Sequence, residues 1–140
     1  MYLPIKIGLS PTLKIRGIIA VEDICKDQII ERCPILLIEV KQESLIKDTP
    51  LNNYIFEWNK EYIAIVLGYG SLYNHSYRPN ARYAHNYQDK LTIFRAIKDI
   101  KKGEEIFVNY NYVPTSKAKL DLEISSLDKT YNTKRLGKVR

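Results

Sequence analysis

The segment 68–83, GYGSLYNHSYRPNARY, holds most of the residue types that could take part in chemistry. Gly68 and Gly70 allow backbone angles and a close ligand approach that other residues do not. The polar run NHS at 74–76 lies between aromatic residues, although a single histidine more often serves structure than function. The first three tyrosines of this segment are four residues apart, so one face of a short helix is an alternative interpretation: Tyr69, Tyr73 and Tyr77.

A second segment, 102–112, has the sequence KGEEIFVNYNY. A glycine turn and two acids precede a short apolar strand, and Tyr110 and Tyr112 follow it. On a strand these two phenols would share one face and could wall a narrow channel. An ordinary hairpin with surface tyrosines is the alternative. The remaining polar candidates follow no recognised metal-site spacing, so we expect no metal: His75, His85 and Asp89.

Short stretches rich in Ile, Val, Tyr and Phe, bounded by Gly, Pro, Asn or Asp, predict a mainly β protein. The predicted strands are 5–8, 18–21, 28–32, 35–40, 62–67, 82–85, 91–96 and 106–108. Helix signals are limited to 42–47, before Pro50, and to 116–127, where Ser116 is a candidate N-cap. An internal similarity also pairs 20–30 with 96–106 at five identical positions, which predicts two similar β corners.

Together, these segments resemble the SET-domain protein lysine methyltransferases. The run 70–80 is similar to the family's NHSxxPN core, and 103–110 is similar to its GEE…Y element. The run 14–20 occupies the place of the N-terminal GxG segment, with Ile15 in place of the first glycine. Order and separation fit from about Ile5 to Tyr112, and the compact chain is most similar to the small stand-alone viral and bacterial members.

The resemblance implies a β-clip fold of small sheets with a knot-like core, in which Asn80 helps to hold the crossing, and a short C-terminal helix. The implied layout is a catalytic domain over 1–114, a helical flank over 115–128 and a basic tail over 129–140. It also implies S-adenosylmethionine as cofactor. The residues matching cofactor-binding positions are Arg16, Gly17, Tyr73, Asn74 and His75.

For the reaction, the resemblance implies methyl transfer to a lysine of a protein substrate, such as a histone or a DNA-packing protein. Tyr110 matches the essential tyrosine, and the lysine-channel positions are Tyr54, Tyr83 and Tyr112. An extra hydroxyl at Tyr83 would leave less room for methyl groups, so we expect mono- or dimethylation. Two alternatives are a non-catalytic SET-like binding module and a small basic β protein that binds nucleic acid.

The charge distribution limits the nucleic-acid interpretation. The chain of 140 residues has 22 basic and 16 acidic residues, a net charge of +6. Residues 129–140 hold five basic residues and no acid, whereas 1–128 hold 17 basic and 16 acidic residues. Weak nucleic-acid contact is therefore expected only through this tail, which could equally serve solubility.

No apolar run approaches the roughly 20 residues of a membrane helix, so we expect no membrane partner. Cys25 and Cys33 form no CxxC pair and are expected to be reduced thiols, with a disulfide between them as the alternative. The expected location is the cytoplasm, or the nucleus or host chromatin if the protein is viral or a secreted effector. Small relatives can pair, so a homodimer is compatible with the resemblance.

Overall fold

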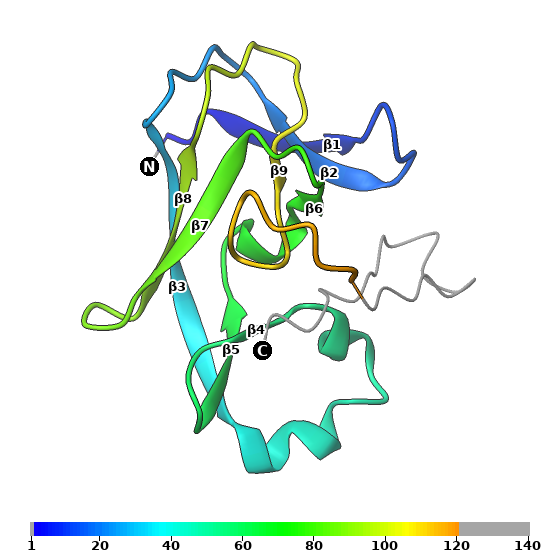
Figure 1. Cartoon of the computed structure of the whole chain (residues 1–140), viewed down its shortest axis with the longest axis vertical. Coiled ribbons are helices and arrows are strands. Elements are labelled where there is room, and N and C mark those ends of the chain that lie inside the picture. Colours follow the sequence, from blue (N-terminus) through cyan, green and yellow to red (C-terminus); the bar gives the residue numbers. More distant parts are fainter. Residues whose placement is uncertain (1, 121–140) are drawn as a thin grey trace.

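A computed structural model describes residues 2–120 of the chain as short strands and 3-10 turns (Figure 1). The strands are β1 Ile5–Leu9, β2 Arg16–Ala20, β3 Ile29–Glu39, β4 Ile55–Glu57, β5 Tyr62–Val66, β6 Asn74–His75, β7 Ala81–Asn86, β8 Leu91–Ala96 and β9 Phe107–Val108. The 3-10 helices are η1 Val40–Leu45, η2 Pro50–Asn53 and η3 Gly70–Leu72. The predicted mainly β class is confirmed.

The strands form one five-stranded sheet and two pairs. The sheet has the order β4-β5-β3-β8-β7, with antiparallel neighbours. β1 and β2 form an antiparallel hairpin in which Gly8 lies opposite Gly17. β6 and β9 form a short parallel pair near the centre of the molecule (Figure 1).

Strand β3 is a single strand of 11 residues, although two strands were predicted on either side of Pro34. Its first part pairs with β8 as far as Pro34, opposite Leu91, and its second part pairs with β5 from Ile35. Proline has no backbone N–H for a ladder bond. The structure uses Pro34 where the strand changes partner, so the proline does not interrupt the strand.

The parallel pair β6–β9 joins two segments that are distant in the sequence, Asn74–His75 and Phe107–Val108. Asn80 fastens this crossing. Its Nδ2 donates to the carbonyl of Glu105 at 2.8 Å, and its Oδ1 accepts the backbone N–H of Phe107 at 2.8 Å. The buried amide satisfies two backbone groups that a ladder does not reach. This is the knot-like core that the family resemblance implied.

The two similar segments, 20–30 and 96–106, contact each other across an approximate two-fold axis. Ile24 and Ile100, which occupy equivalent positions, exchange backbone hydrogen bonds of 2.8 Å in both directions. Each corner also donates a backbone N–H to the aspartate of the other: Lys102 to Asp23 at 2.9 Å and Lys26 to Asp99 at 2.8 Å. The predicted corners therefore exist, and they are mutual partners.

The turn residues of the two corners are also equivalent. Asp27 and Gly103 both have positive φ, 71° and 89°. Their backbone N–H groups donate to the carbonyls of Ala96 and Ala20, at 3.0 and 2.8 Å. A left-handed conformation is favoured by glycine and is tolerated by aspartate.

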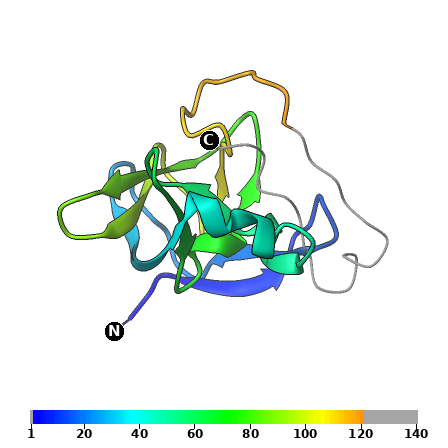
Figure 2. The same cartoon turned by 90° about the horizontal axis from the view of Figure 1, so that it is seen from below.

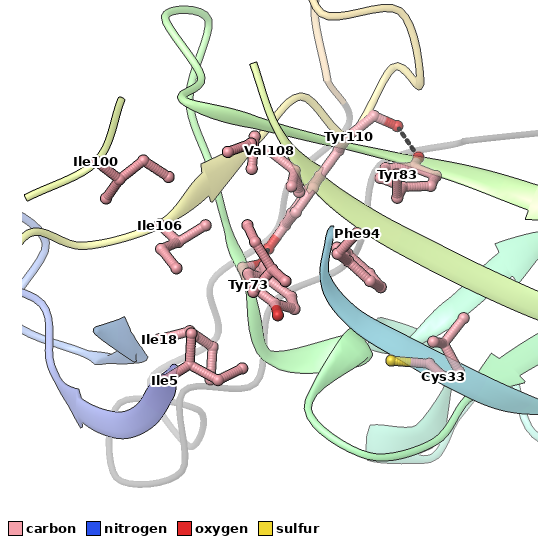
Figure 3. Packing of buried hydrophobic residues seen from close by; sticks show 14 of the residues in the cluster. Ile5, Ile18, Cys33, Tyr73, Tyr83, Phe94, Ile100, Ile106, Val108 and Tyr110 are labelled. Atoms are coloured by element: carbon pink, nitrogen blue, oxygen red, sulfur yellow. Dashed lines mark hydrogen bonds between the residues drawn. The ribbon is translucent and has the colours of Figure 1, made fainter. Parts of the chain in front are cut away.

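The core is unusually rich in phenols. Tyr73, Tyr83 and Tyr110 are among its largest fully buried side chains, together with Phe94 (Figure 3). Tyr73 stacks on Phe94 with ring centroids 4.3 Å apart. Since each phenol brings a hydroxyl into the interior, each needs a hydrogen-bond partner there.

Two helix predictions need correction. The segment predicted as helix over 42–47 is a 3-10 helix, Val40–Leu45, and Pro50 begins a second one. These short turns lie together at one end of the molecule, as seen from below in Figure 2. Residues 116–120 of the predicted C-terminal helix are not helical. The remainder of that helix and the tail over 129–140 lie outside the described residues. Within 2–120, no helix has the length and apolarity needed to cross a bilayer.

Candidate functional site

Tyr110 lies at the centre of the candidate site, just after the parallel pair. Its side chain is 1% exposed, and its hydroxyl donates to the backbone carbonyl of Tyr73 at 2.6 Å. Its backbone N–H donates to Nδ1 of His75 at 3.0 Å. Tyr110 therefore fixes His75, which lies in strand β6, and Tyr73, which precedes that strand.

Burial raises the pKa of Tyr110 well above its usual value of 10.0, and Tyr83, Tyr54 and Glu105 nearby raise it further. Burial likewise raises the pKa of Tyr83. Both phenols therefore stay protonated at neutral pH and present neutral hydroxyls. Such groups can donate or accept a hydrogen bond without introducing a charge.

Tyr110, Tyr83 and Tyr112 meet, although not as a strand would bring them together. Strand β9 ends at Val108, the chain then turns, and Tyr112 has a φ of 73°. Tyr110 and Tyr112 therefore do not lie on a strand, and the shared strand face considered from the sequence does not form. The turn brings the Tyr112 ring edge-on to Tyr83, at 5.4 Å between centroids. The Tyr83 hydroxyl donates to the carbonyl of Tyr110 at 3.4 Å (Figure 3).

Asn74 and Gly17 form a second group, on strands β6 and β2. The Asn74 side-chain amide donates to the carbonyl of Arg16 at 3.1 Å and to Glu105 Oε1 at 2.6 Å. A Cβ on Gly17 would collide with this same Glu105 oxygen and with the Asn74 amide. Glycine is therefore required here by close contact between side chain and backbone.

Glu105 contacts both members of the group formed by Asn74 and Gly17. It is buried, and its Oε2 accepts the hydroxyl of Ser10 at 2.6 Å. The Asn74 Oδ1, also buried, has no hydrogen-bond partner within the described part of the chain. A buried acceptor without a donor is costly. A ligand that brings a donor to this point would remove that cost.

The two groups of predicted site residues are linked. A guanidinium nitrogen of Arg16 donates to the Tyr54 hydroxyl at 3.4 Å. His75 contacts the Tyr110 ring at 5.2 Å between centroids. The Tyr73 ring is buried and its hydroxyl donates to Glu31 at 3.0 Å. Its backbone carbonyl is the group that accepts the Tyr110 hydroxyl.

A strap formed by residues 114–118 crosses near this site. Asn109 Nδ2 donates to the carbonyl of Ser116 at 2.8 Å, and Asn111 Nδ2 donates to that of Ala118 at 2.8 Å. The Tyr77 hydroxyl also donates to Ala118, at 3.0 Å, while its ring contacts His75 edge-on. These side-chain bonds fix the strap without a helix.

The family model of the SET domain matches residues 15–111. The chain belongs to the SET domain family. A histone-lysine N-methyltransferase of Schizosaccharomyces pombe, described as specific for lysine 37 of H3, is 30% identical to this chain over 96 residues. That alignment covers 68% of this chain and 65% of the relative, so the chain spans about two thirds of the curated relative.

Solved structures are similar to this SET domain. A protein described as a histone methyltransferase of Plasmodium falciparum has a TM-score of 0.64 and 34% identity, over 79% of this chain and 95% of its own. Polycomb Repressive Complex 2 of Chaetomium thermophilum, bound to S-adenosylmethionine, has a TM-score of 0.67 and 25% identity. That match covers 79% of this chain and 15% of the other.

Sequence reasoning missed two buried acids of this SET domain, Glu105 and Glu31. Glu105 is the second acid of the GEE run, and the strand alternation after Gly103 was the signal that one acid points inward. A separate cavity of about 640 Å³ is lined by Glu105, Asn80 and Arg78, among others. None of the residues predicted to bind a cofactor lines it. Within residues 2–120, no cluster of His, Cys, Asp and Glu suits a metal ion.

Proposed function

We propose that this SET domain is an S-adenosylmethionine-dependent protein lysine N-methyltransferase. The observation that carries the proposal is the placement of Tyr110 at the crossing of the two family motifs. Its hydroxyl donates to the carbonyl of Tyr73, just before the Asn74–His75 strand, and its backbone carbonyl accepts the hydroxyl of Tyr83, whose ring contacts Tyr112. The curated relative and the Plasmodium falciparum neighbour, both named for histone methylation, support the same activity.

The cofactor would be held by Arg16, Gly17, Asn74 and His75, and it would supply a methyl group on a sulfonium sulfur. The fit rests on Asn74, whose buried Oδ1 has no donor within residues 2–120. Gly17 allows the Asn74 side chain to approach the backbone of β2 closely. S-adenosylmethionine carries amine and hydroxyl donors, so it matches an empty acceptor. Lys14, with a φ of 59°, makes the tight turn before strand β2, despite Ile15 in place of the family glycine.

The lysine that accepts the methyl group must be a neutral amine, although its free pKa is about 10.4. Tyr54, Tyr83, Tyr110 and Tyr112 would surround it with aromatic faces and few water molecules, which disfavours the ammonium form. Their hydroxyls and backbone carbonyls would orient the amine lone pair, since positioning supplies much of the rate of such a displacement. The Tyr83 hydroxyl would occupy room that further methyl groups need, so we propose mono- and dimethylation.

The substrate is proposed to be a basic, histone-like protein. The test uses S-adenosylmethionine with a labelled methyl group, purified histones, and the full chain. We expect the Tyr110→Phe variant to bind the cofactor in calorimetry and to lose at least about a hundredfold in methyl transfer. Tyr2→Phe, at an exposed tyrosine bonded to Glu22, is the matched control. Absence of cofactor binding to the wild type would overturn the proposal, and full activity of Tyr110→Phe would overturn the role of Tyr110.

A further inference from the structure

A second aromatic pocket lies beside the tyrosine cluster. It has a volume of about 350 Å³ and is lined by Glu57, Trp58, His85, Tyr87 and Tyr112. These residues come from the end of β4 and the turn after it, from the end of β7 and the turn after it, and from the turn after β9. Tyr87 is 57% exposed, so the pocket opens to solvent past its ring, whereas Trp58 is 5% exposed.

His85 forms the base of this pocket, because its ring touches the other three. Its centroid lies 4.8 Å from Trp58, 5.9 Å from Tyr87 and 5.9 Å from Tyr112. Trp58 and Tyr87 contact each other at 4.7 Å and form one wall. Tyr112 also lines the pocket, and its ring contacts Tyr83 at 5.4 Å. Tyr112 therefore adjoins both this pocket and Tyr83, a predicted residue of the lysine channel.

The hydrogen bonds of His85 define its charge. Nε2 lies 3.0 Å from the carbonyl of Glu57, which can only accept, so Nε2 carries the proton. Nδ1 then accepts the hydroxyl of Thr92, at 2.9 Å. Burial also lowers the pKa of His85 below its ordinary value of 6.5. The base of the pocket is therefore neutral and does not repel a cation.

The single acid of the pocket is Glu57. Burial raises its pKa, and no nearby positive charge among residues 2–120 offsets that effect. A bound cation would therefore stabilise the charged carboxylate. The aromatic walls also favour a bound cation, because ring faces attract ammonium and guanidinium groups. A carboxylate beside tryptophan and tyrosine rings is typical of sites for cationic groups.

We propose that this pocket binds a second lysine or arginine side chain of the substrate protein, close to the lysine that is methylated. This inference rests on the proposed function and adds the substrate class: a polypeptide with paired basic residues. An extended chain advances about 3.3 Å per residue. The pocket and the Tyr83 ring both adjoin Tyr112, so the two basic residues would be separated by roughly two or three positions.

The first test measures binding without catalysis. Trp58 is the only tryptophan of the chain, so intrinsic tryptophan fluorescence reports directly on the pocket. The probe is acetyl-Gly-Gly-Lys-Gly-Gly-amide, with a norleucine peptide of the same length as its uncharged counterpart. We expect a saturable fluorescence change with the lysine peptide and none with the norleucine peptide. The affinity for the lysine peptide should be about tenfold weaker in the Glu57→Gln variant. Glu61→Gln, at an exposed acid that does not line the pocket, is the matched control.

The second test measures methyl transfer to peptides with one target lysine and either lysine or norleucine two or three positions away. We expect Glu57→Gln to raise KM about tenfold for the paired-lysine peptides, with kcat unchanged, and to leave the norleucine peptides unaffected. Equal effects on both peptide types would overturn the inference while leaving the proposed function intact. If no methyl transfer occurs, the titration decides alone, and the same fluorescence response to lysine and norleucine peptides would overturn the inference.

Discussion

Of the two acids in the GEE run, we expect Glu105 to be the one on which the stability of the fold depends. Glu105→Gln tests this, because the two side chains have nearly the same shape. The buried carboxylate accepts the Ser10 hydroxyl and the Asn74 amide, both at 2.6 Å. Hydrogen bonds to a charged group contribute about 1.5–3 kcal/mol each, and neutral ones about 1 kcal/mol. In the variant, the amide oxygen can still face Asn74, and its NH2 can donate to Ser10.

The expected loss is therefore the charge-assisted part of two bonds, partly offset because a buried charge is removed. We expect the free energy of unfolding to fall by about 1–2 kcal/mol, which lowers the melting temperature by roughly 4–8 °C for a chain of this size. Urea unfolding monitored by circular dichroism gives the free energy, and calorimetric melting gives the temperature.

The adjacent acid provides the control. Glu104 is exposed, and within residues 2–120 its carboxylate accepts only the backbone N–H of Lys101, at 3.0 Å, so Glu104→Gln should change stability by less than about 0.5 kcal/mol. Ser10→Ala should also cost less in the Glu105→Gln background than in the wild type, since the two residues share a bond. Equal stabilities of the Glu104→Gln and Glu105→Gln proteins would refute the reasoning.

Three further predictions concern other parts of the chain. A thiol reagent should modify Cys25 in the folded protein and Cys33 only after unfolding, because Cys33 is buried and burial raises its pKa; early double labelling would contradict this. Since the pKa of His85 is lowered from 6.5 by burial, the unfolded state binds more protons, and stability should fall as pH drops below about 6.5. His85→Gln should reduce that slope in pH-dependent urea titrations, and an unchanged slope would exclude His85 as its source. Tyr83→Phe should shift products towards trimethyllysine in mass spectrometry, whereas an unchanged product ratio would remove Tyr83 from control of methylation.

Local patterning was sufficient to predict most of the strands. The segment 91–96 was predicted with the bounds that the structure has, because alternation and flanking polar residues define it. Strand β6 was missed, since its two residues, Asn74 and His75, form a strand only through a partner more than thirty positions away. Pro34 misled in the opposite direction, because a change of strand partner cannot be recognised from local sequence.

The candidate site, too, could be predicted only in part from the sequence. Motif spacing was sufficient to bring Tyr110, Asn74 and His75 into consideration, and the structure brings Tyr110 into contact with His75. Their supporting contacts could not be predicted, because Glu105 reaches Asn74 from the other motif. The pocket around Trp58 was missed for the same reason, since its residues come from three separate segments of the chain.

The two facing corners have a consequence for the integrity of the chain. Each corner supplies the hydrogen-bond partners that the other lacks, through Ile24 and Ile100 and through the two aspartates. Neither corner can therefore be completed while the other is open, although more than seventy residues separate them. Opening of either corner exposes the amides of both, so their hydrogens should exchange with solvent as one cooperative unit. The beginning and the end of the SET domain are thereby coupled, and no half of it is a separate folding unit.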